Sequence, residues 1–412
     1  MSRLAELIEE LCPDGVEYRP LGEIADLQRG SGMPKKLFID EGIPAIHYGH
    51  IFTKYGIHTK CAAAYLAPED ADKLTRVYPG DLVVANTSEN LEDVGKGVVW
   101  LGEAEGVTGG HATVVRSKTV DSVFLSYFLR TEDFALKKRK YSQGTKVVEL
   151  SAANLSKIDI PVPPLEVQRE IVRILDQFTT LEAELEAELE ARRTQYEHYR
   201  NHLLSYESLA ARGQVEMVKL GDIATRVVTG VTPQASNSRY YQDGSNPWIR
   251  TQDVNFNRIS AASEFVTDNA IDDLPLKWVK ANSVIVAISG ASAGRSAILG
   301  IDAVTNQHCC NLEIDSNRAD YRYVYYSLAA RYTELRGLGR GARGDLNVSI
   351  IKSFEIPVPS MEEQRRIADL LDRFDALVND ISSGLPAEIA ARRAQYEHYR
   401  DRLLSFPEKK AE

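Results

Sequence analysis

Residues 192–206 read RRTQYEHYRNHLLSY, and residues 392–406 read RRAQYEHYRDRLLSF. Only four of these fifteen positions differ between the two stretches. Their separation of 200 residues is far longer than the repeat units of solenoid proteins, which have about 20 to 50 residues. We therefore interpret the chain as two homologous halves, each of which ends in this segment.

The composition is that of an ordinary globular protein. The 412 residues, of which 43% are hydrophobic and 26% charged, suffice for roughly two to four domains. No apolar run approaches the roughly 18 residues that a membrane span requires, and the first residues lack the apolar core of a signal peptide. The cysteines, Cys12, Cys61, Cys309 and Cys310, form neither a CxxC pair nor a disulfide framework. We expect a cytoplasmic protein without membrane contact, whose cysteines are small buried residues.

The charge is distributed unevenly along the chain. A net charge of -10 argues at first against nucleic acid, because proteins that bind it usually carry a basic surface. However, residues 137–146 hold five bases and no acid, whereas residues 182–190 hold five glutamates and no base. The acidic excess therefore belongs to a predicted helix, and basic loops remain available for an anionic partner.

Each half begins with the same series of predicted elements. A helix over residues 2–12 opens the first half, and the segment Leu21–Ala25 has its counterpart in Leu220–Ala224. Short apolar stretches predict strands at 43–48, 81–85, 97–100 and 112–115, with a helix near 122–140. The second half repeats the order with strands at 246–250, 283–287 and 304–308 and a helix near 321–336. We therefore expect an α+β protein with one mixed α/β domain at the start of each half.

Both domains close with a proline-rich exit that leads into a helix. Residues 160–169 read IPVPPLEVQR, and residues 356–365 read IPVPSMEEQR. Alternating prolines hold a chain extended and forbid a helix until they end. The glutamate and glutamine that follow suit a first helical turn.

A long helix is predicted after each exit. Residues 166–205 contain no Gly or Pro and, at about 1.5 Å per residue, would extend roughly 60 Å. Apolar residues recur every three or four positions, a narrow stripe that requires a partner helix, and the copy is the obvious partner. This stripe contains Leu181, Leu185, Leu189, Tyr196, Tyr199 and Leu203 in the first copy, and Phe374, Leu377, Leu385, Ile389, Tyr396, Tyr399 and Leu403 in the second.

The two helices differ by a four-residue unit. The offset between copies is 196 at Gln168 and Gln364 but 200 at Gln195 and Gln395. Between these points the first copy carries Leu-Glu-Ala-Glu in tandem at 181–184 and 185–188. Four residues add about 6 Å and exceed one helical turn by about 40°, so each insertion preserves the stripe with a small rotation. The second copy contains Gly384 and Pro386, which predict a break or kink.

The duplicated helix ending, the Pro-Val-Pro exits and the two divergent domains resemble the DNA-specificity subunits of type I restriction-modification systems, over essentially the whole chain. The resemblance implies two target recognition domains, at residues 1–165 and 207–360, that each read one half of a split site in double-stranded DNA. It also implies two conserved helices, at 166–206 and 361–412, that pair as an antiparallel coiled coil with pseudo-twofold symmetry. In this family the helices dock two modification subunits, which carry the methyltransferase chemistry, and a restriction and translocation subunit joins them.

The same resemblance implies a non-catalytic chain without a cofactor, in which the number of four-residue units sets the spacer between half-sites. Two homologous readers related by a pseudo-twofold axis suit a bipartite site independently of the resemblance. We weigh two alternatives: a coiled-coil scaffold that binds only protein, and a self-sufficient DNA methyltransferase. A methyltransferase should show a Gly-rich methyl-donor loop and an Asn/Asp-Pro-Pro-aromatic motif, and we find neither.

Candidate DNA contacts fall in loops rich in Lys, Arg, Gln and Asn, because cations bind phosphates and forked side chains read bases. The candidates for subunit docking are the stripe residues Leu181, Leu185, Leu189, Tyr196, Tyr199, Leu203, Leu385, Ile389, Tyr396, Tyr399 and Leu403. The candidates in the first domain are Gln28, Arg29, Lys35, Lys36, Asn86, Thr87, Ser88, Lys96, Lys137, Lys138, Arg139, Lys140, Gln143 and Lys146. Those in the second domain are Arg239, Tyr240, Arg250, Gln252, Ser289, Arg295, Arg336, Arg340 and Arg343. For each of them a plain surface or structural role is the competing interpretation.

Three further patterns are weaker. His47, His50, His58 and Cys61 have spacings typical of zinc ligands, but the second half lacks matching ligands, so we predict no metal site. Residues 290–296 imitate a phosphate-binding loop but are one residue short and carry arginine in place of lysine. The repeated Tyr-Glu-His-Tyr lies on the paired helices without a nucleophile, which favours packing and docking over acid-base chemistry.

Overall fold

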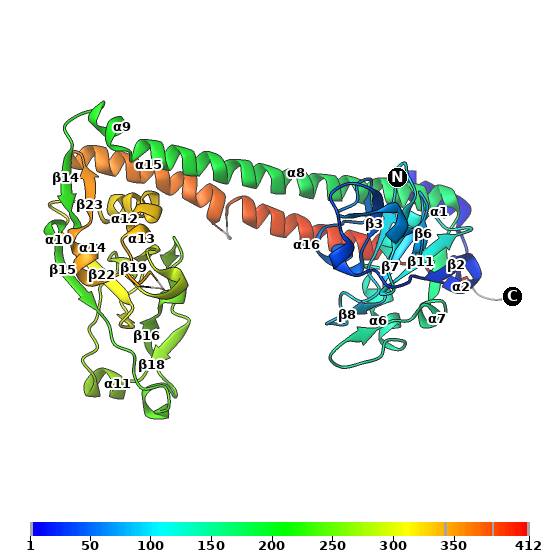
Figure 1. The fold of residues 1–412 in the computed structure, drawn as a ribbon, viewed down its shortest axis with the longest axis horizontal. Helices are drawn as coiled ribbons and strands as arrows, with labels where there is room; N and C mark the ends of the chain where they lie inside the picture. Colours follow the sequence, from blue (N-terminus) through cyan, green and yellow to red (C-terminus); the bar gives the residue numbers. More distant parts are fainter. Residues whose placement is uncertain (1–2, 342–343, 381–382, 410–412) are drawn as a thin grey trace. The chain divides into compact units, whose positions relative to one another are not determined.

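The computed structural model describes residues 3–341, 344–380 and 383–409, and it contains two compact units (Figure 1). Unit 1 comprises Met1–Leu185 and Ile389–Glu412, and unit 2 comprises Glu186–Glu388. Each unit combines one mixed α/β domain with part of both long helices. The expected fold class is confirmed, whereas the domain limits at 165, 206 and 360 stay a prediction because the compact units divide within the helices.

The domain of unit 1 is built on a five-stranded mixed sheet. Its strands lie in the order β2 (Ala25–Arg29), β11 (Ala112–Ser117), β7 (Leu82–Ala85), β9 (Gly97–Trp100) and β4 (His58–Thr59). A second sheet has the order β5 (Tyr65–Leu66), β3 (Ile43–Ile46), β10 (Gly106–Thr108) and β6 (Thr75–Val77). Strands β7 and β9 are buried along their whole length, which explains their unbroken apolar sequences.

Short helices and two small strand pairs complete this domain. The exit strand β13 (Asp159–Val162) pairs antiparallel with β1 (Glu17–Pro20), and β12 (Val148–Glu149) pairs with β8 (Thr87–Ser88). The α-helices are α1 (Arg3–Leu11), α2 (Leu21–Ile24), α3 (Tyr48–Thr53), α4 (Pro68–Ala71), α5 (Ser122–Phe128), α6 (Glu132–Arg139) and α7 (Ala152–Leu155). Helix α5 packs on β7 and β9 and buries Phe124, Leu125 and Phe128 in the largest core of the unit.

The domain of unit 2 repeats this topology. Its five-stranded sheet has the order β15 (Ala224–Thr229), β22 (Cys309–Ile314), β19 (Val284–Ala287), β20 (Ser296–Leu299) and β17 (Arg258–Ile259). The smaller sheet contains β18 (Glu264–Val266), β16 (Asn246–Ile249) and β21 (Val304–Thr305), and the exit strand β23 (Glu355–Val358) pairs with β14 (Glu216–Lys219). Its helices are α9 (Tyr206–Ala210), α10 (Leu220–Ile223), α11 (Asp268–Asp273), α12 (Tyr321–Ala330), α13 (Tyr332–Gly337) and α14 (Val348–Ser353). The matching strand orders support the duplication.

The sequence predicted one helix at residues 122–140 and one at 321–336, but each of these segments forms two helices, α5 and α6 in unit 1 and α12 and α13 in unit 2. In unit 1 the Thr131 hydroxyl donates to the Phe128 carbonyl (2.7 Å) and accepts the Phe134 N–H (3.2 Å), so it ends α5 and caps α6. In unit 2 the backbone turns at Arg331, with φ -103 and ψ 20, between α12 and α13. The apolar period continues across both turns, which is why the pattern alone predicts one helix.

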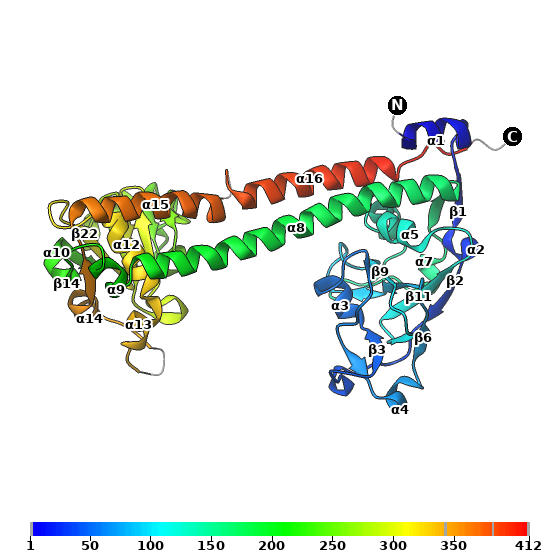
Figure 2. The same ribbon diagram turned by 90° about the horizontal axis from the view of Figure 1, so that it is seen from above.

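The long helices pair antiparallel within each unit, as expected. Helix α8 (Leu165–Leu203) contacts α16 (Leu385–Leu403) in unit 1, where Phe178 stacks on Tyr399 with ring centres 5.6 Å apart and Glu182 pairs with Arg393 at 2.7 Å. In unit 2 the other end of α8 contacts α15 (Met361–Asn379), and Tyr199 lies 6.3 Å from Phe374. Figure 2 shows α16 and α15 following α8 in the respective units. The C-terminal end of each copy of the long helix therefore packs on the N-terminal part of the other copy.

The predicted stripe is only partly buried. Tyr196 and Ile389 are buried, but Leu181 is 53% exposed and Leu377 is 43% exposed. The expected interruption is confirmed, because α15 ends at Asn379 and α16 begins at Leu385. A Cβ on Gly384 would approach the carbonyl oxygens of Ala376 and Leu377 to 2.5 and 2.7 Å, which explains the glycine at this turn.

The composition predicted buried cysteines and no membrane-spanning helix. Cys12, Cys309 and Cys310 are buried, but Cys61 is exposed, so the expectation was wrong for that residue. Among the helices of the described segments, none is both long and apolar enough to cross a lipid bilayer.

Candidate nucleic-acid interface

One edge of the five-stranded sheet carries loops in both domains. In unit 1 the loops after β2 and β7 and the turn before β11 meet there, because β11 runs antiparallel to both neighbours. A Cβ on Gly30 would lie 2.0 Å from the Gly109 carbonyl oxygen, so the loop after β2 and the turn touch at backbone distance. In unit 2 the loops after β15 and β19 and the turn before β22 occupy the matching positions. This loop-bearing edge is the candidate interface.

A hairpin folds back onto this edge in each domain. The bridges Gln143↔Glu149 and Arg340↔Asp345 close the two hairpins. The Leu150 N–H donates to the Asn86 carbonyl, and the Leu346 N–H donates to the Ile288 carbonyl, both at 2.8 Å. The basic loops that the sequence singled out are therefore attached to the loop after the central strand at equivalent positions.

In unit 1 an arginine ties the hairpin to the end of β2. The Arg29 guanidinium lies 3.1 Å from Glu149 Oε1 and donates to the Gly110 carbonyl oxygen at 3.3 Å. Half of the Arg29 side chain remains exposed, Gln28 precedes it on β2, and Ser88 lies on β8, which pairs with β12 of the hairpin. The structure thus gathers Arg29, Ser88 and Gln143 around Glu149 from three separate stretches of sequence, whereas the Gln28 side chain accepts a hydrogen bond from Arg116.

The basic run of unit 1 divides into structural and exposed cations. Lys138 is 3% exposed, and its ammonium donates to the carbonyl oxygens of Glu92 (2.9 Å) and Val94 (2.7 Å). Burial lowers the pKa of Lys138 to about 8. Lys137 pairs with Asp133 at 2.8 Å and lies over the ring of Tyr18. We remove Lys138 from the candidate contacts, whereas Arg139, Lys140 and Lys146 are exposed.

Two predicted base readers are also buried. Asn86 has no exposed surface, and its side-chain oxygen accepts the Thr113 hydroxyl at 2.9 Å. Thr87 is 7% exposed, and its hydroxyl lies 3.0 Å from His111 Nδ1. Asn86 joins the end of β7 to β11, and Thr87 joins β8 to the turn before β11, so the expectation that they read bases is corrected. Of the consecutive candidates Asn86, Thr87 and Ser88, only Ser88 is partly exposed.

The remaining candidates of unit 1 lie away from the hairpin. Lys96 pairs with Asp93 at 2.6 Å, within a cleft of about 1210 Å³ that runs between the domain and the paired helices. Lys35 and Lys36 are exposed on a short 3-10 helix, Lys35–Leu37. Within the described segments, no hydrogen bond or ion pair links these three lysines to Arg29 or Glu149.

Unit 2 uses an aspartate to anchor its hairpin. The Ser289 hydroxyl and the Gly290 N–H donate to Asp345 Oδ1 at 2.9 and 3.1 Å, and Gly290 has φ +73. Arg340 is exposed beside this anchor, and Arg336 extends over the ring of Tyr332. Arg295 donates to Asn255 at 2.9 Å. Arg343 lies outside the described residues.

The other candidates of unit 2 lie on or beside two short 3-10 helices, Ser238–Tyr240 and Thr251–Asp253. Arg239 pairs with Asp273 at 3.3 Å, and Tyr240 packs with the core around Trp248. Arg250 pairs with Glu264 at 3.1 Å and lies over Trp248, whereas Gln252 is exposed. These residues form a second basic group on the domain, separate from the hairpin.

Sequence reasoning did not identify the two hairpin carboxylates. Glu149 holds Arg29, and Asp345 holds Ser289, so both orient candidate contact residues. A usable signal was present, because Glu149-Leu150-Ser151 and Asp345-Leu346-Asn347 share the pattern acid, Leu and helix cap. The loops around this pattern differ in length, which obscured the match.

The histidines of the zinc-like spacing are placed in different environments. His47 caps α3 by accepting the Gly49 N–H at 3.1 Å, and burial lowers its pKa to about 4. His50 lies beside it, with ring centres 5.4 Å apart, while His58 lies 3.7 Å from Asp176. Within the described segments no group of three or more His, Cys, Asp and Glu side chains has the arrangement of a metal site.

Comparison with known proteins agrees with this architecture. The curated specificity subunit of the type I restriction enzyme EcoR124I/EcoR124II from Escherichia coli is 36% identical over 269 residues, which are 63% of this chain and 65% of that subunit. The match therefore spans just under two thirds of that relative. A putative type I restriction enzyme specificity subunit from Haemophilus influenzae is 27% identical over an alignment of 414 positions, which covers 95% of this chain and 96% of the relative.

A solved structure and a family model complete the comparison. The type I restriction-modification S subunit from M. genitalium shares the fold over 95% of this chain and 96% of its own, with a TM-score of 0.55 and 15% identity. A family model described as "Type I restriction modification DNA specificity domain" matches residues 13–191 and again residues 213–391. With both halves matched, the chain belongs to the type I restriction-modification DNA-specificity family and carries two copies of its specificity domain.

Proposed function

We propose that this chain is the non-catalytic specificity subunit of a type I restriction-modification complex, and that it binds double-stranded DNA at a bipartite site. Each α/β domain reads one half-site through the loop-bearing edge of its five-stranded sheet. The observation that carries this proposal is the duplication of that edge. A hairpin with exposed cations bonds to the residue after the central strand at the same position of both domains and carries a carboxylate that holds a candidate contact residue, although the loop sequences differ. Equal scaffolds with unequal loops suit two readers of different sequences.

The contacts divide into two roles. The exposed cations Arg139, Lys140, Lys146, Arg336 and Arg340 would bind phosphates, which gives affinity and register. Gln28, Arg29, Ser88, Gln143, Ser289 and Arg295 would read base edges, since Arg and Gln form paired hydrogen bonds with bases. The remaining residues are secondary candidates for DNA contact. They are Lys35, Lys36, Lys96 and Lys137 in unit 1 and Arg239, Tyr240, Arg250, Gln252 and Arg343 in the second domain.

The helices would serve as the spacer and the docking surface. Antiparallel contacts at Phe178 and Tyr399 and at Tyr199 and Phe374 hold the helices together within their units. Leu181, Tyr199 and Tyr399 nevertheless expose 53%, 44% and 37% of their surface. Exposed aromatic and leucine side chains on a rigid helix pair favour protein docking. The partners we propose are two modification subunits, joined by the restriction and translocation subunit in the full complex.

Gel-shift titration tests this proposal against the alternatives. The full chain, co-purified with its modification subunits, should bind a selected duplex at least about a thousandfold more tightly than random duplex, the lower range for specific DNA binding. A protein-only scaffold would leave the complex with equal affinity for the selected and the random duplex. A self-sufficient methyltransferase would transfer methyl groups as the isolated chain, and we expect none.

A further inference from the structure

A buried glutamine joins each domain to its long helix in the same way. Gln168 Oε1 accepts the Asp121 N–H at 2.7 Å, and its Nε2 donates to the Pro163 carbonyl oxygen at 2.6 Å. Gln364 makes the matching pair with Asp320 (3.0 Å) and Pro359 (2.9 Å). The two glutamines are 0% and 1% exposed. One side chain thus connects the helix, the proline exit and the cap of the domain's main helix.

A tyrosine forms a second link about two turns further along the long helix. The Tyr127 hydroxyl of α5 donates to Asp176 on α8, and the Tyr326 hydroxyl of α12 donates to Asp372 on α15, both at 2.7 Å. Asp176 and Asp372 differ by the same 196 residues that separate the two glutamines. Each domain is therefore held at two points along its helix, which restricts rotation as well as translation.

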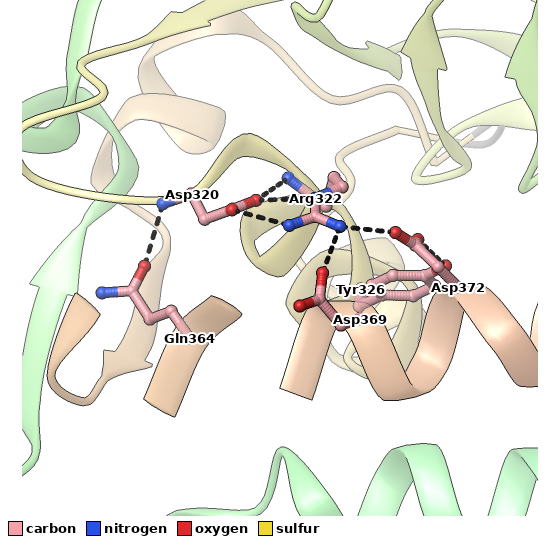
Figure 3. A network of polar contacts seen from close by, with 6 residues as sticks. All are labelled: Asp320, Arg322, Tyr326, Gln364, Asp369 and Asp372. Carbon is pink, nitrogen blue, oxygen red and sulfur yellow. Dashed lines mark hydrogen bonds and ion pairs between the residues drawn. The ribbon is translucent and has the colours of Figure 1, made fainter. Parts of the chain in front are cut away.

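The joint of unit 2 contains an additional cation (Figure 3). Arg322 donates to Asp369 and Asp372, both at 2.7 Å, and lies 3.2 Å from Asp320. The matching position after the helix cap of unit 1 is Val123, which cannot pair. There His58 lies 3.7 Å from Asp176 instead.

The linked helices lead directly to the candidate interface. Helices α5 and α12 pack on the central strands of their sheets, β7 and β9 in unit 1 and β19 and β20 in unit 2. The Ser126 hydroxyl of α5 donates to the Ile57 carbonyl oxygen at 2.9 Å, which adds a polar tie within the packed core. Strands β7 and β19 end at the loops of the interface. A displacement at the joint would therefore move those loops as a body.

We propose that Gln168 and Gln364, together with the Tyr127–Asp176 and Tyr326–Asp372 pairs, are positioning residues that fix the reading loops relative to the helical spacer. They set the accepted separation of the half-sites without contacting DNA. This inference rests on the proposed function, because it presupposes a bipartite site. It assigns a role in spacer selectivity to side chains that lie at the domain–helix joint.

The test measures affinity against spacer length. The full chain with its modification subunits first selects a duplex from a pool with randomised half-sites and spacers, and duplexes one or two base pairs longer and shorter are then made. Gln168→Met and Gln364→Met remove both hydrogen bonds at similar volume. Gln177→Met, at an exposed position of α8 next to Asp176, makes the same change outside the hydrogen bonds of the joint and serves as the control.

We expect the joint variants to flatten the spacer profile. The ratio of affinities for the best spacer and for its neighbours should fall by about fivefold or more, the loss of about one hydrogen bond, with unchanged half-site bases. Gln177→Met should keep the wild-type ratio. Tyr127→Phe removes one hydrogen bond, and Arg322→Val removes the ion pairs with three aspartates but leaves both glutamine joints intact. Both variants should flatten the profile less and keep the test valid if a glutamine variant does not fold.

Two results separate this inference from the proposed function. A wild-type profile without any spacer optimum would overturn the bipartite reading and the inference with it. A sharp wild-type optimum that persists unchanged in folded joint variants would overturn the inference alone. An equal loss of affinity at every spacer length would also overturn it, since that result indicates a purely structural role.

Discussion

Insertion of one Leu-Glu-Ala-Glu unit after Glu184 should lengthen the spacer of the recognised site by one or two base pairs. The insertion point lies at the division between the compact units, which falls between Leu185 and Glu186 within the continuous helix α8. The ion pair of Glu182 with Arg393 and the contact of Tyr199 with Phe374 lie on either side and remain within their units. The core of neither unit is therefore disturbed.

The magnitude follows from helix and DNA geometry. Four helical residues add about 6 Å along the axis and about 40° of rotation. One base pair of B-DNA accounts for roughly 3.4 Å and about 35°. The rotation thus corresponds to about one base pair and the translation to nearly two, so the shift is one base pair if rotational phase dominates and two if length does.

Methylation of a spacer library measures the shift. Host cells that express the full complex would carry bipartite sites with spacers in steps of one base pair, and the methylated class would be read by sequencing. A control that replaces Leu185–Glu188 by another four-residue helix former keeps the length and should leave the spacer unchanged. Methylation at the original spacer after the insertion would refute the ruler mechanism.

Three further outcomes follow from the interface. Lys146→Ala should weaken binding uniformly across sequences and reduce the slope of log affinity against log salt by about 1, measured by titration at several salt concentrations. Gly144→Ala should reduce affinity with little change in unfolding temperature, because φ is +100 and a Cβ would lie 2.1 Å from the Val147 carbonyl oxygen, which displaces only the hairpin. Because burial lowers the pKa of Lys138 from 10.5 to about 8, protonation opposes folding in this window, and the wild type should gain stability over Lys138→Met as pH rises through it, by about 3 kcal/mol.

A specific result would contradict each of these three predictions. A changed half-site preference in Lys146→Ala would assign base reading to that lysine in place of phosphate binding. Unchanged affinity in Gly144→Ala would remove the hairpin from the interface. Parallel unfolding curves for wild type and Lys138→Met at pH 8 and 10.5, measured by chemical denaturation, would show that Lys138 is solvated in the folded protein.

The architecture could be predicted from the sequence to a large extent. The repeat at 192–206 and 392–406 indicated two halves, and the absence of Gly and Pro between residues 166 and 205 indicated the long helix. These features are local in the chain, and the periodic signal of a helix is contained in contiguous residues. The same reason explains the correct break before Pro386 and the extended exits at residues 160–164 and 356–360.

The candidate site depended on the fold. Lys138 and Asn86 have the composition of DNA ligands, yet both are buried, because their exposure is decided by strands and helices that are distant in sequence. Arg29 meets Glu149 across 120 residues, a contact that no local pattern contains. The sequence by itself therefore determined the duplication, the helices and the family, whose signals are periodic or contiguous. Only the tertiary structure decided which polar side chains face solvent and which ones join each domain to its helix, since burial and hydrogen bonding are set by non-local packing.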